Sequence, residues 1–212
     1  MTDVTRVHLL RHGEVHNPGK VLYGRLPGFG LSALGHDMAA AAAKALAGRD
    51  VALLLTSPLQ RARETVAPLE ALYGLTARAD DRLIESASKF EGRQVDRGWR
   101  SFADTSALPF LRNPFRPSWG EPYAETAARM LDLVTDVRDE VRGHEAICVS
   151  HQLPIYVLRR YVEGRRLWHD PRGRQCGLAS VTTLTFSGAR LASVAYSEPA
   201  GALSRKPATP GA

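Results

Sequence analysis

Three short segments of the sequence carry side chains that could do phosphoryl chemistry. They are Arg11-His12-Gly13-Glu14, the stretch from Ser57 to Thr65 with Arg61, and Ser150-His151. Arginine forks match phosphate oxygens bidentately. A neutral histidine can attack phosphorus as a nucleophile, and a glycine lets the backbone approach an oxyanion closely. Two histidines and two arginines therefore indicate a phosphate site, provided that the three segments meet.

Short apolar runs directly precede these segments and predict the strands that position them. Residues 6–10, 51–55 and 146–150 have the character of buried strands. Helical patterns follow Ser32 and occupy residues 57–73, 122–142 and 153–162, and a terminal hairpin is expected at 178–186 and 190–196. A shorter strand is expected near residues 76–79.

This alternation predicts an α/β fold: a three-layer α/β/α sandwich around a mostly parallel sheet with an antiparallel edge. Ligands of such sheets bind beyond the C-terminal ends of the strands. We therefore expect the three reactive segments to converge on one pocket. The second helix has the clearest predicted start, with Ser57 as N-cap, Pro58 at the first helical position and Gln60 completing a capping box.

Length and composition predict one soluble globular domain. The 212 residues are 44% hydrophobic and 24% charged, which excludes a disordered, collagen-like or disulfide-scaffold chain. We expect a single domain over residues 1–197, an excursion or lid over the pocket at 86–120, and a flexible tail at 198–212. No apolar run is long enough to span a membrane, and no signal peptide is apparent, so we expect a cytoplasmic protein.

Charge and cysteine content limit the other function classes. The two cysteines, Cys148 and Cys176, form no disulfide framework, and too few ligands are grouped for a zinc site. We therefore expect no metal and no cofactor. The net charge of +6 suits an anionic ligand. It is also the only nucleic-acid-binding feature present, so we expect no nucleic-acid partner, and no P-loop occurs.

The order of the motifs resembles the histidine phosphatase superfamily, the phosphoglycerate-mutase-like group. The tetrapeptide at Arg11-His12-Gly13-Glu14 is similar to its signature. Five further motifs follow in the family's order: Leu31-Ser32 with Gly35; Ser57-Pro58-Leu59 through Arg61-Ala62 to Thr65; Leu83 and Glu85 with Glu91-Gly92; Gly120-Glu121 with Arg129; and Val149-Ser150-His151. One tetrapeptide is weak evidence, but an ordered set over about residues 6 to 160 is specific.

The resemblance implies a role for each matching residue. His12 would be the nucleophile that forms a phosphohistidine, and Arg11, Arg61 and His151 would line the phosphate pocket. Glu85 would donate a proton to the leaving oxygen and later activate water. The charge of a nearby phosphate would raise the pKa of Glu85, as a general acid at neutral pH requires. The cationic cluster neutralises the phosphoryl charge, so this chemistry requires no metal.

The sequence departs from the family pattern at three places. Gln152 stands where the family usually has glycine after the last histidine, and Asn17 comes one residue earlier than expected. The segment Ser86 to Phe90 lacks a glycine that often precedes Glu91-Gly92, which makes Glu85 the least secure assignment. We expect Gln152, Asn17 and Arg25 as candidate substrate contacts.

The sequence favours a metal-independent phosphomonoesterase acting on a small phosphorylated metabolite. A cofactor-dependent phosphoglycerate mutase is the alternative, although the longer excursion and Lys-Tyr segment of the mutases that it resembles are missing. A non-catalytic phosphate-binding protein on the same fold is a second alternative. Five arginines of the excursion suggest an acidic or multiply phosphorylated substrate: Arg93, Arg97, Arg100, Arg112 and Arg116. The substrate itself and the oligomeric state are left open.

Overall fold

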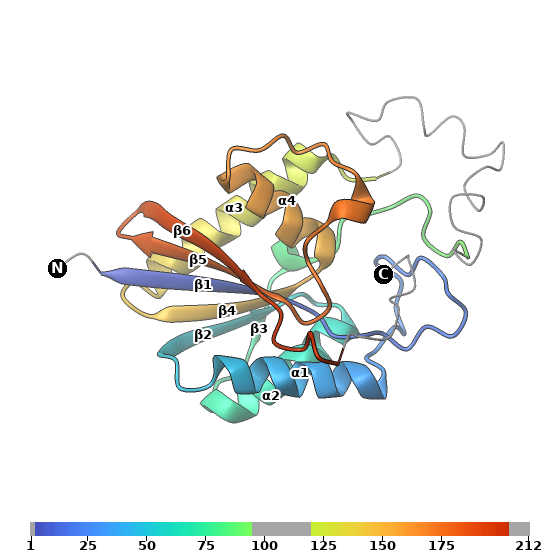
Figure 1. Ribbon diagram of the computed structural model, residues 1–212, viewed down its shortest axis with the longest axis horizontal. Coiled ribbons are helices and arrows are strands. Elements are labelled where there is room, and N and C mark those ends of the chain that lie inside the picture. The colour runs from blue at the N-terminus through green and yellow to red at the C-terminus, as the bar shows by residue number, and fades with distance from the viewer. Residues whose placement is uncertain (1–2, 95–119, 204–212) are drawn as a thin grey trace.

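Six strands form one mixed sheet at the centre of the computed structural model, which describes residues 3–94 and 120–203 (Figure 1). The order across the sheet is β3-β2-β4-β1-β5-β6. The strands are β1 (Val4–Arg11), β2 (Val51–Thr56), β3 (Arg78–Ala79), β4 (Glu145–Ser150), β5 (Val181–Ser187) and β6 (Arg190–Ser197). β1, β2, β3 and β4 pair in parallel, whereas β5 and β6 form the antiparallel edge.

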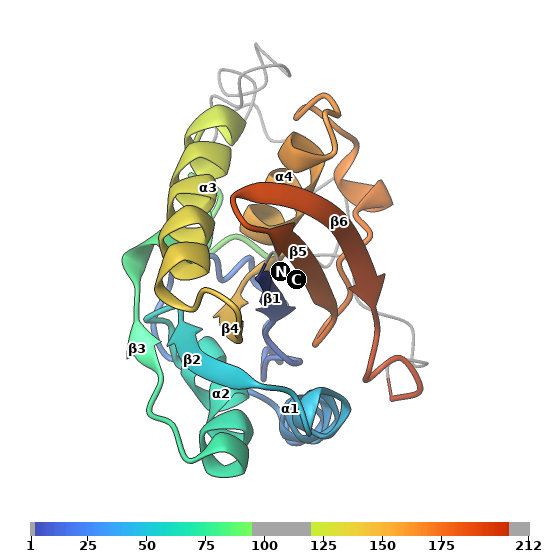
Figure 2. The ribbon, with the colours of Figure 1, turned by 90° about the vertical axis from the view of Figure 1, so that its left-hand side faces the viewer.

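Helices cover both faces of this sheet (Figure 2). One face carries α1 (Ala33–Leu46) and α2 (Gln60–Tyr73), and the other carries α3 (Tyr123–Glu140) and α4 (Gln152–Val162). The predicted three-layer sandwich is therefore confirmed. All six residues of β4 are buried, as expected for a central parallel strand with helices on both sides.

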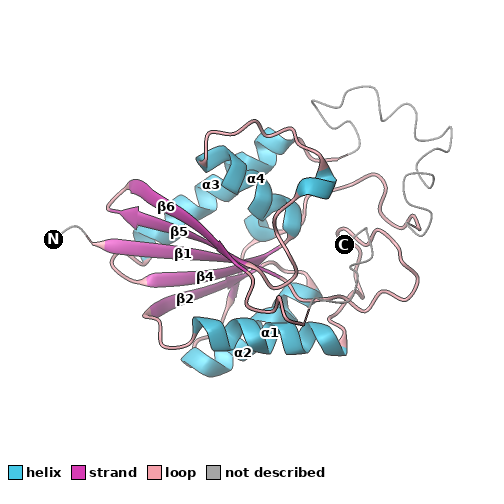
Figure 3. Cartoon of the chain, in the orientation of Figure 1, coloured by secondary structure: helices cyan, strands magenta, loops and turns pink. Residues whose placement is uncertain are grey.

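Loops gather at the end of the sheet where β1, β2 and β4 terminate (Figure 3). Two of these loops pair with each other, because Val21 forms an antiparallel bridge with Gln94 and Leu22 N donates to Arg93 O at 2.8 Å. The two ends of the predicted excursion also meet, since Ser88 bridges Gly120. The loop after β1 and the start of the excursion thus lie together at this edge.

The predicted start of the second helix is wrong by two to three residues. α2 begins at Gln60, its N-cap is Leu59, and no side chain caps it. The Ser57 hydroxyl instead lies 2.8 Å from Nε2 of His151, and the Gln60 amide donates to Glu64. The residues that resembled a capping box therefore make other contacts, while the predicted end is confirmed by Gly74 in the left-handed conformation.

The expected flexible tail, residues 198–212, overlaps folded structure at its start. Ala200 is only 1% exposed and belongs to the apolar cluster beneath α1 and α2, so a flexible tail would begin after this residue. In the described ranges, no helix combines the length and apolar character needed to cross a bilayer.

A buried polar pair lies at the end of the sheet opposite the loops. His8 on β1 is fully buried, with Nε2 at 2.7 Å from Glu145 and Nδ1 at 2.8 Å from Thr183. Burial lowers the pKa of His8 below its ordinary value of 6.5, and the attraction of Glu145 offsets this only in part. His8 is therefore neutral in the folded protein at pH 7.

The neutral state of His8 predicts a pH-dependent stability. Below about pH 6.5, His8 binds a proton in the unfolded chain but not in the folded protein. The free energy of unfolding therefore falls as the pH is lowered. We expect His8→Gln to flatten the slope of unfolding free energy against pH by up to about 1.4 kcal/mol per pH unit. Urea denaturation between about pH 7.5 and 5.5 measures this. His36→Gln at an exposed histidine is the control, and identical slopes for His8→Gln and the wild type would contradict the prediction.

Candidate active site

The three reactive segments meet at the C-terminal edge of the parallel strands. His12 N donates to Ser150 O at 3.1 Å, and Ser57 N donates to Val149 O at 2.9 Å. The rings of His12 and His151 have centroids 5.1 Å apart. Adjacent strands β1, β4 and β2 thus bring segments from three parts of the chain to one point.

The turn that carries His12 is packed against the first turn of α1. A Cβ on Gly13 would lie 2.4 Å from Gly35 O, and one on Gly35 would lie 2.0 Å from Glu14 O. The Ser32 hydroxyl donates to the Glu14 carboxylate at 2.6 Å and accepts from Gly35 N at 3.0 Å. The two glycines permit this approach, and the Ser32 and Glu14 contacts hold it.

His12 is held in the tautomer that a nucleophile needs. Its Nδ1 lies 2.8 Å from Gly13 O, and because a carbonyl only accepts, Nδ1 carries the proton. Nε2 therefore keeps its lone pair. Burial, followed by the charges of Arg61 and Arg11, holds the pKa of His12 well below its ordinary value. His12 is consequently neutral near pH 7.

His151 is neutral as well, and its tautomer is the opposite one. Arg61 Nη2 lies 3.2 Å from Nδ1, and since a guanidinium only donates, Nδ1 accepts. Nε2 then carries the proton and donates to the Ser57 hydroxyl at 2.8 Å. Burial is the main cause that lowers the pKa of His151, and the positive groups around it add to the effect.

Two buried guanidinium groups are held by backbone carbonyls. Arg11 Nη1 donates to Cys176 O at 2.6 Å, and Arg61 Nη2 donates to Gly24 O at 2.7 Å. The Arg61 guanidinium also lies over the ring of Tyr23, 4.8 Å from its centroid. Within residues 3–94 and 120–203, neither arginine forms an ion pair and the Nε atom of each lacks a partner. Both groups are thus available to an anion.

Glu85 lies close enough to this cluster to feel the charges of Arg61 and Arg11. Removal of its carboxyl group from water is the largest influence and raises the pKa of Glu85, while the Ser86 amide, at 2.9 Å, and the arginines oppose it. The sequence predicted a raised pKa from the charge of a bound phosphate. The structure shows that burial already raises it in the free protein.

Three side chains fix the backbone just before and at Glu85. Ser150 Oγ donates to Leu83 O at 2.7 Å, Arg129 donates to Arg82 O, and Arg25 Nε donates to Glu85 O at 2.6 Å. Arg25 and Arg129 are themselves ion-paired with Glu121. The Glu121–Arg129 motif of the sequence therefore holds the Glu85 segment in place.

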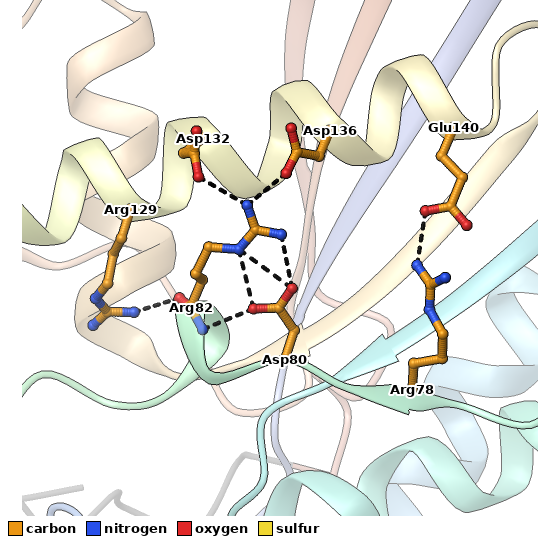
Figure 4. Close-up of polar contacts among 7 residues, drawn as sticks. All are labelled: Arg78, Asp80, Arg82, Arg129, Asp132, Asp136 and Glu140. Atoms are coloured by element: carbon orange, nitrogen blue, oxygen red, sulfur yellow. Dashed lines mark hydrogen bonds and ion pairs between the residues drawn. The ribbon is translucent and has the colours of Figure 1, made fainter.

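An ion-pair network joins the short 3₁₀ helix η1 (Asp81–Leu83) to α3 (Figure 4). Arg82 pairs with Asp80 at 2.9 Å, Asp132 at 2.8 Å and Asp136 at 2.7 Å. Arg78 and Glu140 form a further pair along α3. Each exposed ion pair contributes little to stability by itself. Together they hold the backbone that leads into Glu85 against α3.

The structure gives two of the three candidate substrate contacts a bracing role. The amide of Asn17 closes its own loop, since Oδ1 accepts from Val21 N and Nδ2 donates to Val21 O. Arg25 is engaged by Glu85 O and Glu121. These contacts use part of each side chain, and a contact of Asn17 or Arg25 with substrate stays a prediction.

Gln152 lies beside the pocket and is connected to an arginine that the sequence analysis missed. Its Nε2 lies 3.5 Å from Cys176 O, and its Oε1 accepts from Arg174 Nη1 at 3.4 Å. Arg174 belongs to none of the motifs, so no sequence pattern marked it. Ser57 was predicted as a helix cap, and its contact with His151 became apparent only in the fold. The contact of Arg61 with the ring of Tyr23 also became apparent only there.

Most of the predicted excursion lies outside the described residues. Four of its five arginines also lie outside the described residues: Arg97, Arg100, Arg112 and Arg116. The expectation of a lid over the pocket therefore stays a prediction. In the described ranges, no three potential metal ligands among histidine, cysteine, aspartate and glutamate are grouped.

The fold, with two histidines and two arginines near the strand ends, agrees with the histidine phosphatase superfamily that the sequence resembles. Residues 7–199 match the family model of the histidine phosphatase superfamily (branch 1), and the chain belongs to that superfamily. The family resemblance noted in the sequence analysis is therefore confirmed.

The relatives include mycobacterial proteins. An uncharacterised protein of Mycobacterium tuberculosis, Rv0525, is 56% identical over 94% of this chain and 99% of its own length. A glucosyl-3-phosphoglycerate phosphatase of the same species is 33% identical over 62% of this chain and 60% of its own. The native structure of mycobacterial glucosyl-3-phosphoglycerate phosphatase superposes with a TM-score of 0.72 at 28% identity, covering 89% of this chain and 97% of that one.

The contact between Gly35 and Glu14 predicts that alanine at position 35 destabilises the protein, although alanine usually stabilises a helix relative to glycine. Alanine inside a helix normally stabilises it by up to about 1 kcal/mol relative to glycine. We expect Gly35→Ala to lower the unfolding free energy instead, by about 1–3 kcal/mol, because its Cβ would meet Glu14 O. Urea denaturation measures the change. Gly173→Ala, with open space around its Cβ, is the control, and a stabilised Gly35→Ala would contradict the packing argument.

Proposed function

We propose that this protein is a metal-independent phosphomonoesterase that forms a phosphohistidine at His12. The observation that carries the proposal is the free Nε2 lone pair of His12, with Nδ1–H fixed on Gly13 O. Among the described residues, the Nε atoms of Arg11 and Arg61 have no partner. The ring centroid of His151 lies 5.1 Å from that of His12. A nucleophile among unpaired cations suits a phosphoryl group.

The first step transfers the phosphoryl group to the protein. Nε2 of His12 attacks phosphorus, the P–N bond forms, and the bond from phosphorus to the leaving oxygen breaks. Protonated Glu85 gives its proton to that oxygen, so the leaving group departs as an alcohol. Arg11 and Arg61 stabilise the equatorial oxygens through position and charge, and neutral His151 contributes through its position.

The second step hydrolyses the phosphohistidine. The Glu85 carboxylate takes a proton from water, the water oxygen attacks phosphorus, and the P–N bond breaks. Phosphate leaves, His12 recovers its lone pair, and Glu85 is again protonated. A raised pKa suits Glu85 for both roles, because the group must give and take a proton near neutral pH.

The comparisons support hydrolysis of a small phosphorylated metabolite. Relatives named glucosyl-3-phosphoglycerate phosphatase match this chain over 62% of its length in sequence and over 89% of its length in structure. The missing Lys-Tyr segment disfavours a mutase. Isomerisation of 3-phosphoglycerate in the presence of 2,3-bisphosphoglycerate, faster than phosphate release, would reverse that preference.

Replacement of the nucleophile tests the proposal directly. We expect wild-type protein to hydrolyse p-nitrophenyl phosphate in excess chelator, and His12→Ala to lose at least about a thousandfold in kcat/KM. Exposed His36→Ala is the control, expected to keep wild-type rates. Protein quenched in alkaline denaturant, which preserves the acid-labile P–N bond of a phosphohistidine, should carry labelled phosphate on wild type only. Undiminished hydrolysis by His12→Ala would overturn the mechanism.

The role of Glu85 predicts a dependence on the leaving group. An alkoxide needs a proton as it departs, whereas p-nitrophenolate does not. We expect Glu85→Gln to slow an alkyl phosphate by about 10²–10⁴-fold, and p-nitrophenyl phosphate much less in the first step. Single-turnover rates measure the difference, with Glu140→Gln as control. In wild type, the alkyl rate should fall as the pH rises through the raised pKa of Glu85, because the acid loses its proton; equal losses on both esters would argue against a general acid.

A further inference from the structure

Arg174 is a third cation at the edge of the phosphate pocket. It follows the short 3₁₀ helix η4 (Pro171–Gly173) and precedes β5. Its Nε donates to Nε2 of His169 at 2.9 Å, and its Nη1 lies 3.4 Å from Gln152 Oε1. Neither of these two side chains carries a negative charge.

His169 holds Arg174 in a fixed position. Nδ1 of His169 donates to Leu167 O at 2.6 Å, so Nε2 keeps the lone pair that accepts from Arg174. The imidazole is packed between two rings, with centroids 5.2 Å from Tyr123 and 4.8 Å from Tyr156. Burial, as the main cause, lowers the pKa of His169 to about 4. The guanidinium is therefore placed before any ligand arrives.

A chain of contacts connects Arg174 to the phosphate pocket. Gln152, its partner, directly follows His151 and reaches Cys176 O, the carbonyl that also accepts from Arg11. Arg174 is also near enough to feel the charges of Glu85 and Arg11. In the proposed mechanism Glu85 protonates the leaving oxygen. These contacts place Arg174 at the edge of the pocket, and the charge of Glu85 reaches it, which favours the leaving-group side for Arg174 if Glu85 is the proton donor.

Arg174 also has a charge that the surrounding protein does not pair. The other two cations of the pocket, Arg11 and Arg61, likewise lack an ion pair in the part of the chain that the structure describes, and Arg174 forms none there either. A largely enclosed cation without a carboxylate is costly unless a ligand supplies one. The phosphoryl group would engage Arg11 and Arg61, which leaves Arg174 for a different part of the substrate.

We propose that Arg174 binds a carboxylate on the leaving group, so that the substrate is a phosphomonoester of a hydroxy acid. One guanidinium carries one charge, which a carboxylate balances, whereas a second phosphate dianion would be under-neutralised. The planar fork also suits the two carboxylate oxygens. This inference rests on the proposed function, because Glu85 defines the leaving-group side.

The test compares two ligands that differ only in this group. 3-Phosphoglycerate and glycerol 3-phosphate share the phosphate and the three-carbon chain, but one has a carboxylate where the other has a hydroxymethyl group. Binding is measured by calorimetry in a His12→Ala background, so that turnover does not interfere. We expect 3-phosphoglycerate to bind about 10- to 100-fold more tightly, and Arg174→Gln to reduce this ratio to below about threefold. Arg172→Gln, an exposed arginine paired with Asp170, is the matched control and should leave the ratio unchanged.

The outcomes separate this inference from the proposed function. Equal or undetectable binding of the two ligands overturns the role of Arg174, as does a loss of stability in Arg174→Gln with an unchanged ratio. The proposed function fails independently if wild-type protein hydrolyses neither p-nitrophenyl phosphate nor 3-phosphoglycerate. A carboxylate preference that depends on Arg174 would stand even then, as evidence for a binding protein.

Discussion

Arg11 and Arg61 carry buried positive charge for which the described part of the chain supplies no paired carboxylate, and much of the architecture follows from this. Arg11 and Arg61 are 4% and 1% exposed, and backbone carbonyls rather than acidic side chains hold them in place. Carbonyl oxygens orient a guanidinium without neutralising it. The protein therefore keeps its cations available for an anion, and this has an energetic cost that the surrounding fold must offset.

The fold offsets that cost through a rigid frame around the site. Central strands with apolar residues on both faces bury the sheet between two helical layers, and their ends fix the positions of His12 and His151. The close contact of Gly13 with Gly35 joins the nucleophile's turn to α1. Charged side chains around the site hold backbone segments in position. Glu121, for example, is ion-paired with Arg25 and Arg129, the two arginines that bind the backbone of the Glu85 segment.

Neutral histidines follow from the same constraint. Burial, and then the charges of nearby cations, lower the pKa of His12, His151 and His169. Each imidazole is therefore neutral and has one nitrogen with a lone pair and one with a proton. The partner of the protonated nitrogen then decides what the other nitrogen can do. For His12 the Gly13 carbonyl leaves a nucleophile, and for His169 the Leu167 carbonyl leaves an acceptor for Arg174.

Apolar strands and motifs at strand ends are local patterns, and they predicted the class of fold and the family, both of which are confirmed. The same patterns selected His12, His151, Arg11 and Arg61 as the proposed phosphate site, and the structure brings these four residues near one another. The prediction from sequence was wrong at Ser57, where a helix cap and a histidine partner look alike until His151 is brought within 2.8 Å. Only the tertiary structure decided that Arg25 and Asn17 act as braces and that Arg174 lies beside the pocket. Those roles depend on contacts between distant segments, such as Arg25 with Glu121, and side-chain type alone carries no information about a distant partner.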